Sequence, residues 1–123
     1  MNYLLVLVGG ALGSVARYGT GVLAGRWLGP NYPWGTLAVN LIGGFCMGLL
    51  VGILARTGGS EQTRLLIGVG VLGGFTTFSA FSLDSMLMIE RGDWLPALGY
   101  ILVSVAGSIA ALALGLTAVR ALA

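Results

Sequence analysis

The sequence predicts an all-α integral membrane protein with four transmembrane helices, a break in the third helix, and assembly as a dual-topology antiparallel homodimer. Of its 123 residues, 57% are hydrophobic and only 8% are charged. A soluble domain carries roughly 25% charged residues. Six basic and four acidic side chains cannot cover the surface of a soluble protein of this size. The composition therefore places the chain in a lipid bilayer.

A helix needs about 20 mostly apolar residues to cross the hydrocarbon core of a bilayer. The chain offers four such stretches, at residues 3–28, 34–55, 65–89 and 95–119. We expect them to form a single four-helix transmembrane domain over residues 1–123, without a soluble portion. The first stretch has no basic region before it and is too long for a cleavable signal peptide.

Short connectors with turn and capping residues separate the stretches. Pro33 suits the start of the second helix, and Pro96 is tolerated in the first turn of the fourth. Ser60 and Asp93 are the predicted N-caps of the third and fourth helices. Aromatic side chains near the predicted ends form the expected interfacial belt: Tyr3, Trp27, Tyr32, Trp34 and Trp94.

Glycine makes up 22 of the 123 residues, about three times its usual share. Small residues spaced by four let helix backbones approach closely in lipid, although glycine is also frequent in membrane helices generally. The spacing predicts a compact bundle. It occurs in four sets: Gly9 and Gly13; Gly21 and Gly25; Gly44, Gly48 and Gly52; Gly107, Ala111 and Gly115.

The side chains that the sequence lacks exclude several function classes. There is no His, no Lys, and a single cysteine, Cys46. Histidine catalysis, Schiff-base or P-loop lysines, intramolecular disulfides and cysteine zinc sites are therefore excluded. No basic run exists to grip phosphates. We expect no enzyme and no nucleic-acid partner.

The arginines are distributed almost evenly across the bilayer. Cytoplasmic loops normally carry the excess of basic residues, and here one side has three arginines and the other two once Arg17, inside the first stretch, is set aside. So small a bias predicts insertion in both orientations, unless another effect fixes one of them. Opposite insertion would supply an inverted partner, hence the antiparallel homodimer. The two sets are Arg56, Arg64 and Arg120 on one side, and Arg26 and Arg91 on the other.

Arg17 lies in the middle of the first stretch, where a charge costs roughly 2.5–3.5 kcal/mol on insertion scales. One interpretation is an electropositive vestibule that attracts anions. The other is a shifted helix from which Arg17 snorkels to an interface. Asp84 in the third stretch is a possible partner for its charge.

Polar groups also line one face of the second and fourth helices. Thr36 and Asn40 are one turn apart, and the Asn40 carboxamide offers two N–H donors that suit a desolvated anion. The alternative for Asn40 is a hydrogen bond that holds two helices together. Tyr100, Ser104 and Ser108 form a stripe that either lines a pathway or bonds back to carbonyls one turn earlier.

The third stretch contains residues 73–82, which read GGFTTFSAFS. Gly73 and Gly74, followed by two threonines, are poor helix formers. We expect a break here, at about the membrane midpoint. Unwound backbone at that depth must be buried in protein or line a cavity, and its free carbonyls can coordinate a cation.

An aromatic strip and a hydroxyl strip follow this break. Phe78 and Phe81 are three residues apart, and so are Ser79 and Ser82. An aromatic ring has a positive edge, which can stabilise a small anion weakly enough for conduction. The alternative for the two phenylalanines is ordinary core packing.

These motifs resemble those of the Fluc, or CrcB, family of fluoride channels. The resemblance rests on GGFTTFSAFS, on GALG at residues 10–13 followed by Arg17 and Tyr18, and on GTLAVN at residues 35–40 followed by Gly43. It covers essentially the whole chain, with the fourth helix matched by spacing alone. Ala80 stands where the family commonly has a threonine, which interrupts a hydroxyl track along the third helix.

The resemblance implies a fluoride-selective channel that crosses the bacterial inner membrane several times. Members of the family assemble as antiparallel dual-topology homodimers with two pores. They export cytoplasmic fluoride by passive electrodiffusion and so relieve its toxicity. The implied partners are the fluoride ion, a second copy of the chain and membrane lipid.

The resemblance also implies roles for individual residues. Asn40 looks like the asparagine that hydrogen-bonds fluoride, and Phe78 and Phe81 look like the pair whose ring edges line the pore. The backbone carbonyls of Gly73 and Thr76 correspond to those that hold a structural Na⁺ at the dimer interface. The remaining implied positions are Arg17 near a vestibule, Thr36 near an entrance, and Ser79, Ser82, Tyr100, Ser104 and Ser108 along the pathway.

Two other functions fit parts of the same pattern. A small dual-topology proton-coupled multidrug exporter also has four spans, but it needs a carboxylate inside the first helix, where this chain has only Arg17. A non-transporting assembly subunit is the second. In that case substitutions at Asn40 or Phe81 would change the stability of the protein but would not change any ion flux.

Overall fold

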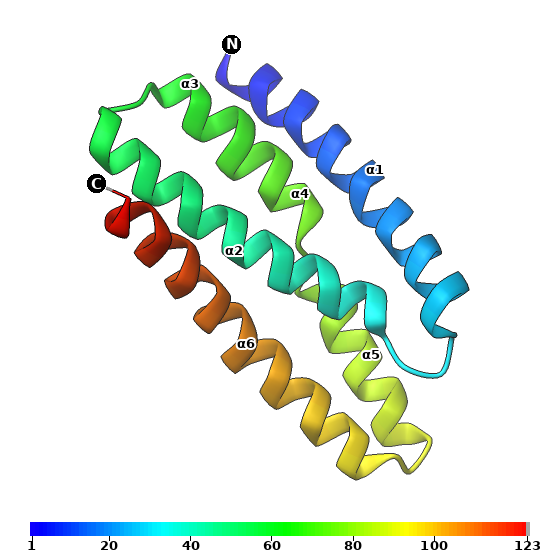
Figure 1. The fold of residues 1–123 in the computed structure, drawn as a ribbon. Coiled ribbons are helices and arrows are strands. Elements are labelled where there is room, and N and C mark those ends of the chain that lie inside the picture. Colours follow the sequence, from blue (N-terminus) through cyan, green and yellow to red (C-terminus); the bar gives the residue numbers. More distant parts are fainter. Residues whose placement is uncertain (123) are drawn as a thin grey trace.

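A computed structural model describes residues 1–122, which are helical apart from short connections (Figure 1). Three continuous helices are α1 (Asn2–Leu28), α2 (Trp34–Thr57) and α6 (Trp94–Ala121). The third span consists of α3 (Glu61–Thr63), the π-helix η1 (Arg64–Leu72), α4 (Gly73–Phe75) and α5 (Ser79–Glu90). Four helical segments of the described chain are long and apolar enough to cross a membrane. The predicted all-α membrane fold with an interrupted third helix is confirmed.

The third span changes neighbours along its length. Its first part, η1 and α4, packs along α1, whereas α5 packs against α6. Figure 1 shows the span passing beside α2 between these two positions. The break is therefore the point at which the span crosses from one outer helix to the other.

Close helix packing depends on glycine at most of the predicted positions. A Cβ added at Gly48 would collide with the Leu112 carbonyl of α6, and one added at Gly13 would collide with the Val71 carbonyl of η1. The pair Gly21 and Gly25 was expected to act in the same way, and this is wrong within the chain. A Cβ at either would meet no atom within 4 Å.

Two predicted N-caps have different outcomes. The Ser60 hydroxyl accepts the Thr63 N–H at 3.1 Å and caps α3. The Asp93 side chain makes no capping bond at the start of α6. Its carboxylate pairs instead with Arg91, 3.2 Å from the guanidinium Nε, because a full charge two residues away competes with the helix N–H groups. Asp93 therefore holds the predicted N-cap position of α6, but its side chain does not cap the helix.

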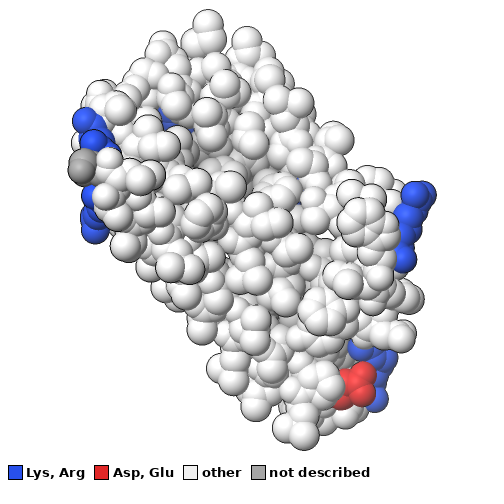
Figure 2. Space-filling view, in the orientation of Figure 1, with Lys and Arg blue, Asp and Glu red and all other residues white. Residues whose placement is uncertain are grey.

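The surface of the described chain suits a bilayer. On the face shown in Figure 2, charged side chains gather toward the two ends of the elongated molecule, with a wide uncharged band between them. Many large apolar side chains are exposed, whereas the buried cluster near α5 and α6 is small. In lipid an exposed apolar side chain carries no penalty, since the surroundings are themselves apolar.

Candidate functional site

The break in the third span lies at residues 76–78, at the two threonines rather than at the two glycines. Gly73 and Gly74 are helical in α4, and Gly73 has φ −62° and ψ −38°. Thr76 is extended, with φ −83° and ψ 158°. The expectation that the glycines take part in the break was wrong. The β-branched threonines, with side-chain hydroxyls that bond to backbone, replace the helical ladder.

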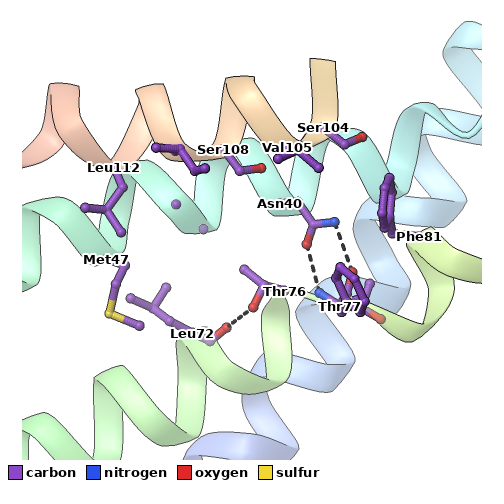
Figure 3. Close-up of a pocket in the computed structure, with 14 residues that line it drawn as sticks. Asn40, Met47, Leu72, Thr76, Thr77, Phe81, Ser104, Val105, Ser108 and Leu112 are labelled. Carbon is purple, nitrogen blue, oxygen red and sulfur yellow. Dashed lines mark hydrogen bonds between the residues drawn. The ribbon is translucent and has the colours of Figure 1, made fainter. Parts of the chain in front are cut away.

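The Asn40 carboxamide of α2 makes two hydrogen bonds with the backbone of Thr77 (Figure 3). The Asn40 Nδ2 donates to the Thr77 carbonyl at 3.0 Å, and the Thr77 N–H donates to Asn40 Oδ1 at 2.8 Å. This is the interhelical bonding that the sequence left as one of two interpretations. It uses one of the two N–H bonds of the carboxamide, so the second remains as a donor.

The carbonyls of Gly73, before the break, and of Thr76, at its start, lose the N–H donors that a continuous helix would give them. In an α-helix the Thr77 N–H would bond to the Gly73 carbonyl, and the Ala80 N–H to the Thr76 carbonyl. Here the Thr77 N–H bonds to Asn40, and the Ala80 N–H donates to Thr77 Oγ1 at 3.1 Å. Gly73 and Thr76 therefore present carbonyl oxygens that are free of helical hydrogen bonds.

Arg17 reaches the same break from α1. Its Nε donates to the Gly74 carbonyl at 3.2 Å, from a half-buried position. The side chain thus points inward to the break. Asp84, considered as its partner, instead accepts the Tyr100 hydroxyl at 3.1 Å, because α5 carries Asp84 away toward α6. Arg17 and Asp84 form no ion pair in the described chain.

A cavity of about 450 Å³ opens beside the break (Figure 3). Its walls come from α2, the break itself and α6. Six sequence-derived site residues line it together, although their sequence positions span three helices. They are Asn40, Thr76, Phe78, Phe81, Ser104 and Ser108.

The two phenylalanines hold different positions at this cavity. Phe78 is 77% exposed, whereas Phe81 is 8% exposed, and their ring centroids are 5.5 Å apart. Behind Phe81 lies Tyr100, which is fully buried with its ring centroid 5.4 Å from that of Phe81. Phe81 is therefore fixed between two rings, and Phe78 has one open side.

Ser104 is the unusual polar group of the cavity. It is 5% exposed, and its hydroxyl is the one buried side-chain oxygen or nitrogen in the described chain that has no hydrogen-bond partner. A buried hydroxyl without a partner costs roughly 1–3 kcal/mol. Ser108, one turn further on α6, lines the same cavity. The stripe of serines thus faces the cavity, with Ser104 Oγ unpaired.

Of the other predicted pathway residues, Tyr100 lies behind Phe81 and outside the lining of the cavity, and three lie elsewhere. Ser79 and Ser82 are exposed, and the Ser82 hydroxyl bonds back to the Phe78 carbonyl at 3.0 Å. Thr36 lines two smaller cavities next to each other, one with Arg17 and one with Asp84. The central cavity therefore contains part of the predicted pathway, and Thr36 lies toward one of its ends.

Sequence reasoning missed the role of Thr77, and it named Asp84 only as a possible partner for Arg17 and not for Tyr100. Thr77 anchors Asn40 and caps α5, and Asp84 accepts the Tyr100 hydroxyl. Thr77 lay within the motif GGFTTFSAFS. Poor helix propensity predicts a break there, but it does not indicate which backbone groups will bind a distant asparagine. A carboxylate within a predicted span was the available signal for Asp84.

The described residues contain no cluster of acidic, cysteine or histidine side chains that could hold a metal ion. Carbonyl oxygens are thus the ligands that this site offers to a cation. Comparison with known proteins identifies the family of the chain. The family model described as "CrcB-like protein, Camphor Resistance (CrcB)" matches residues 4–116. The chain belongs to the CrcB family.

Relatives of the CrcB family match almost the full chain. Proteins named "Fluoride-specific ion channel FluC" from Mesorhizobium japonicum and Phenylobacterium zucineum are 57% identical over 121 residues and 60% identical over 119. The alignments cover 98% of both chains in the first case, and 95% of this chain and 94% of the relative in the second. The relative of the same name from Paracoccus denitrificans is 55% identical, with 98% and 96% covered.

These findings establish the class of protein. CrcB relatives are ion channels and not enzymes. With four helices able to span a membrane, the chain is a multi-pass protein of the bacterial inner membrane.

Proposed function

We propose that the chain is a fluoride-selective channel that exports cytoplasmic fluoride by passive electrodiffusion and so relieves fluoride toxicity. The names of the CrcB relatives support fluoride as the ion. The observation that carries the proposal is the Ser104 hydroxyl, which is buried and unpartnered in a cavity that it shares with Asn40 and two phenyl rings. An O–H donor left unpaired there is available to an anion.

The cavity suits a small anion in transit. One N–H of Asn40 is not used by Thr77, and Ser104 and Ser108 supply further hydroxyls. The edges of Phe78 and Phe81 add weak positive electrostatic potential. Arg17 adds a full positive charge in the adjacent cavity that also contains Thr36. Hydroxyls, ring edges and one amide replace hydration without trapping the ion, as conduction requires.

An antiparallel homodimer with two pores completes the proposal. The central cavity is open at the surface of one chain, and Phe78 is mostly exposed beside it. The near-equal arginine counts, three and two, favour insertion in both orientations. A second, inverted copy would cover the open side of each cavity and give two equivalent pathways.

We also propose a structural Na⁺ at the dimer interface. The residues fit the ion, because Gly73 and Thr76 offer carbonyl oxygens released from the helical ladder. Unwound backbone carbonyls are the groups that hold Na⁺ in membrane proteins. The ion would supply positive charge at the membrane midplane. Asn40 and Thr77 keep the backbone open there through their paired hydrogen bonds.

The rival function, proton-coupled drug export, lacks its key group. Such an exporter needs a carboxylate in its first helix. Here α1 contains no Asp or Glu, and the charged residue within its span is Arg17. Asp84, on α5, is bonded to Tyr100.

Efflux from liposomes tests the function directly. Purified protein is reconstituted with internal KF or KCl, and valinomycin starts the release that an ion-selective electrode records. We expect rapid fluoride release, no chloride release above protein-free vesicles, and no dependence on an imposed proton gradient. Equal release of both halides would contradict selectivity, and proton-driven release would favour the exporter.

A further inference from the structure

Tyr32, in the connection between α1 and α2, contacts the pathway residue Tyr100. The two rings meet edge to face, with centroids 5.7 Å apart and planes at 86°. The second aromatic neighbour of Tyr32 is Trp34, and the centroids of these two rings are 4.6 Å apart. Edge-to-face pairs add about 0.5–1.5 kcal/mol beyond the area they bury. The connection thus makes a specific contact with α6.

This contact extends a row of rings to the break. From Tyr32 the row continues to Tyr100, Phe81 and Phe78, with successive centroid distances of 5.7, 5.4 and 5.5 Å. Tyr32 lies at one end of it, outside the membrane-spanning helices, and Phe78 lies at the central cavity. A surface connection is therefore in packing contact with the centre of the pathway.

The connection is built to hold the Tyr32 ring in one place. Pro30 and Pro33 flank it and fix two φ angles, and the Trp34 N–H donates to the Tyr32 carbonyl at 2.8 Å. Gly29 turns the chain at φ 88°, a value that L-residues rarely adopt. Burial raises the pKa of Tyr32 above its usual value of 10.

Tyr100 depends on its neighbours for its orientation. Its ring is fully buried, with Phe81 and Tyr32 packed against it. Its hydroxyl donates to Asp84 at 3.1 Å. Without the Tyr32 ring, a void would open beside Tyr100, because packed interiors close such gaps only in part. The ring would then have room to turn, and its hydroxyl would leave Asp84.

We propose that Tyr32 is a positioning residue of the ion pathway, which holds the Tyr100 ring so that its hydroxyl stays at Asp84. The inference rests on the proposed fluoride function. Tyr32 does not itself touch the ion in this role. The Tyr32 ring, and not its hydroxyl, positions Tyr100. Phenylalanine should therefore substitute for Tyr32 without loss of efflux.

Fluoride efflux from liposomes tests this with matched variants. Tyr32→Ala and Tyr32→Leu should lower the initial fluoride rate by about tenfold, the size of effect that contacting residues exert on each other. Tyr32→Phe should conduct at the wild-type rate. Trp27→Ala, which removes an exposed aromatic ring at the same end of the molecule, serves as the control. The leucine variant keeps an apolar side chain at position 32 in case the alanine variant does not fold. Gel filtration shows whether each variant is folded and uniform in size.

A double-mutant cycle separates positioning from general loosening. Tyr100→Phe should itself slow efflux, since it removes the positioned hydroxyl. In that background, Tyr32→Leu should change the rate by less than about twofold, because no hydroxyl remains to be misplaced. A full tenfold loss in both backgrounds, a wild-type rate for Tyr100→Phe, or no effect of Tyr32→Leu would overturn the inference. Absence of fluoride efflux from the wild-type protein would instead contradict the proposed function.

Discussion

Asn40 and Thr77 bind each other twice: the Asn40 Nδ2 donates to the Thr77 carbonyl at 3.0 Å, and the Thr77 N–H donates to Asn40 Oδ1 at 2.8 Å. The pair makes α2 a support for the broken third span. It also removes the Thr77 N–H from the helical ladder, which releases the Gly73 carbonyl. One asparagine thus keeps the break open and retains a donor for the cavity.

Asn40→Asp should abolish conduction. The new carboxylate oxygen would face the Thr77 carbonyl with no proton between them, and its negative charge would repel an anion from the cavity. We expect fluoride efflux to fall by about a hundredfold or more, which corresponds to roughly 3 kcal/mol, the upper end of the cost of leaving a buried polar group without its hydrogen-bond partner. Asn2→Asp, at the exposed start of α1, is the control. Wild-type efflux from the Asn40 variant would remove this residue from the pathway.

Phe81→Ile should slow efflux while the protein stays folded. Isoleucine keeps the side chain apolar but removes the ring edge, and it also removes the ring against which Tyr100 packs. We expect a decrease of about tenfold or more in the initial rate, with a stability cost of roughly 1–3 kcal/mol. Phe45→Ile, on α2 and outside the lining of the cavity, provides the comparison. If both variants conduct equally, the ring edge plays no part.

Gly48→Ala and Gly99→Ala should have opposite effects on stability. A Cβ at Gly48 would strike the Leu112 carbonyl and approach the Leu116 nitrogen to 2.9 Å, whereas one at Gly99 would meet no atom within 4 Å. Overpacking of α2 against α6 should cost about 1–3 kcal/mol. Alanine at Gly99 should be neutral or gain up to about 1 kcal/mol from helix propensity. Thermal unfolding in detergent measures both, and equal melting temperatures would contradict the packing described here.

Removal of Na⁺ should destabilise the protein. If Gly73 and Thr76 hold the ion through their carbonyls, protein kept from cell lysis onward in a bulky organic cation should melt at a lower temperature and lose fluoride efflux. Return of Na⁺ should restore both properties. Identical melting and efflux with and without Na⁺ throughout purification would contradict the proposed site.

Single added arginines should tilt the orientation of the chain in opposite directions. Thr57→Arg adds to the end with three arginines, and Asn31→Arg adds to the end with two, both at exposed positions. Reporters active on only one side of the membrane, fused to the C-terminus, should both be active in the wild type. Each variant should favour a different reporter. One active reporter in all three proteins would exclude dual topology.

Co-expression extends the same test to the dimer. If function needs an inverted partner, each arginine variant alone should protect cells from fluoride less well than the wild type. The two together should restore protection. Full protection by either variant alone, with its orientation shown to be fixed, would contradict the antiparallel dimer.

The sequence by itself determined the membrane fold, because the balance of apolar and charged residues depends on composition alone. It also indicated the break, since the threonines of GGFTTFSAFS are poor helix formers, and the polar faces of α2 and α6, since helical spacing is local. The glycine spacing predicted close packing at Gly48 for the same reason, although it did not say which helix packs there.

Tertiary structure decided everything that depends on a partner far along the chain. The sequence could not choose between an ion and Thr77 as the partner of Asn40, nor show that Arg17 bonds to Gly74 while Asp84 bonds to Tyr100. It also missed the π-helix η1 and placed Gly21 and Gly25 where an added Cβ would collide with a neighbouring helix, which neither does. Hydrogen bonds and close packing depend on distances between helices, and spacing along one helix does not contain those distances.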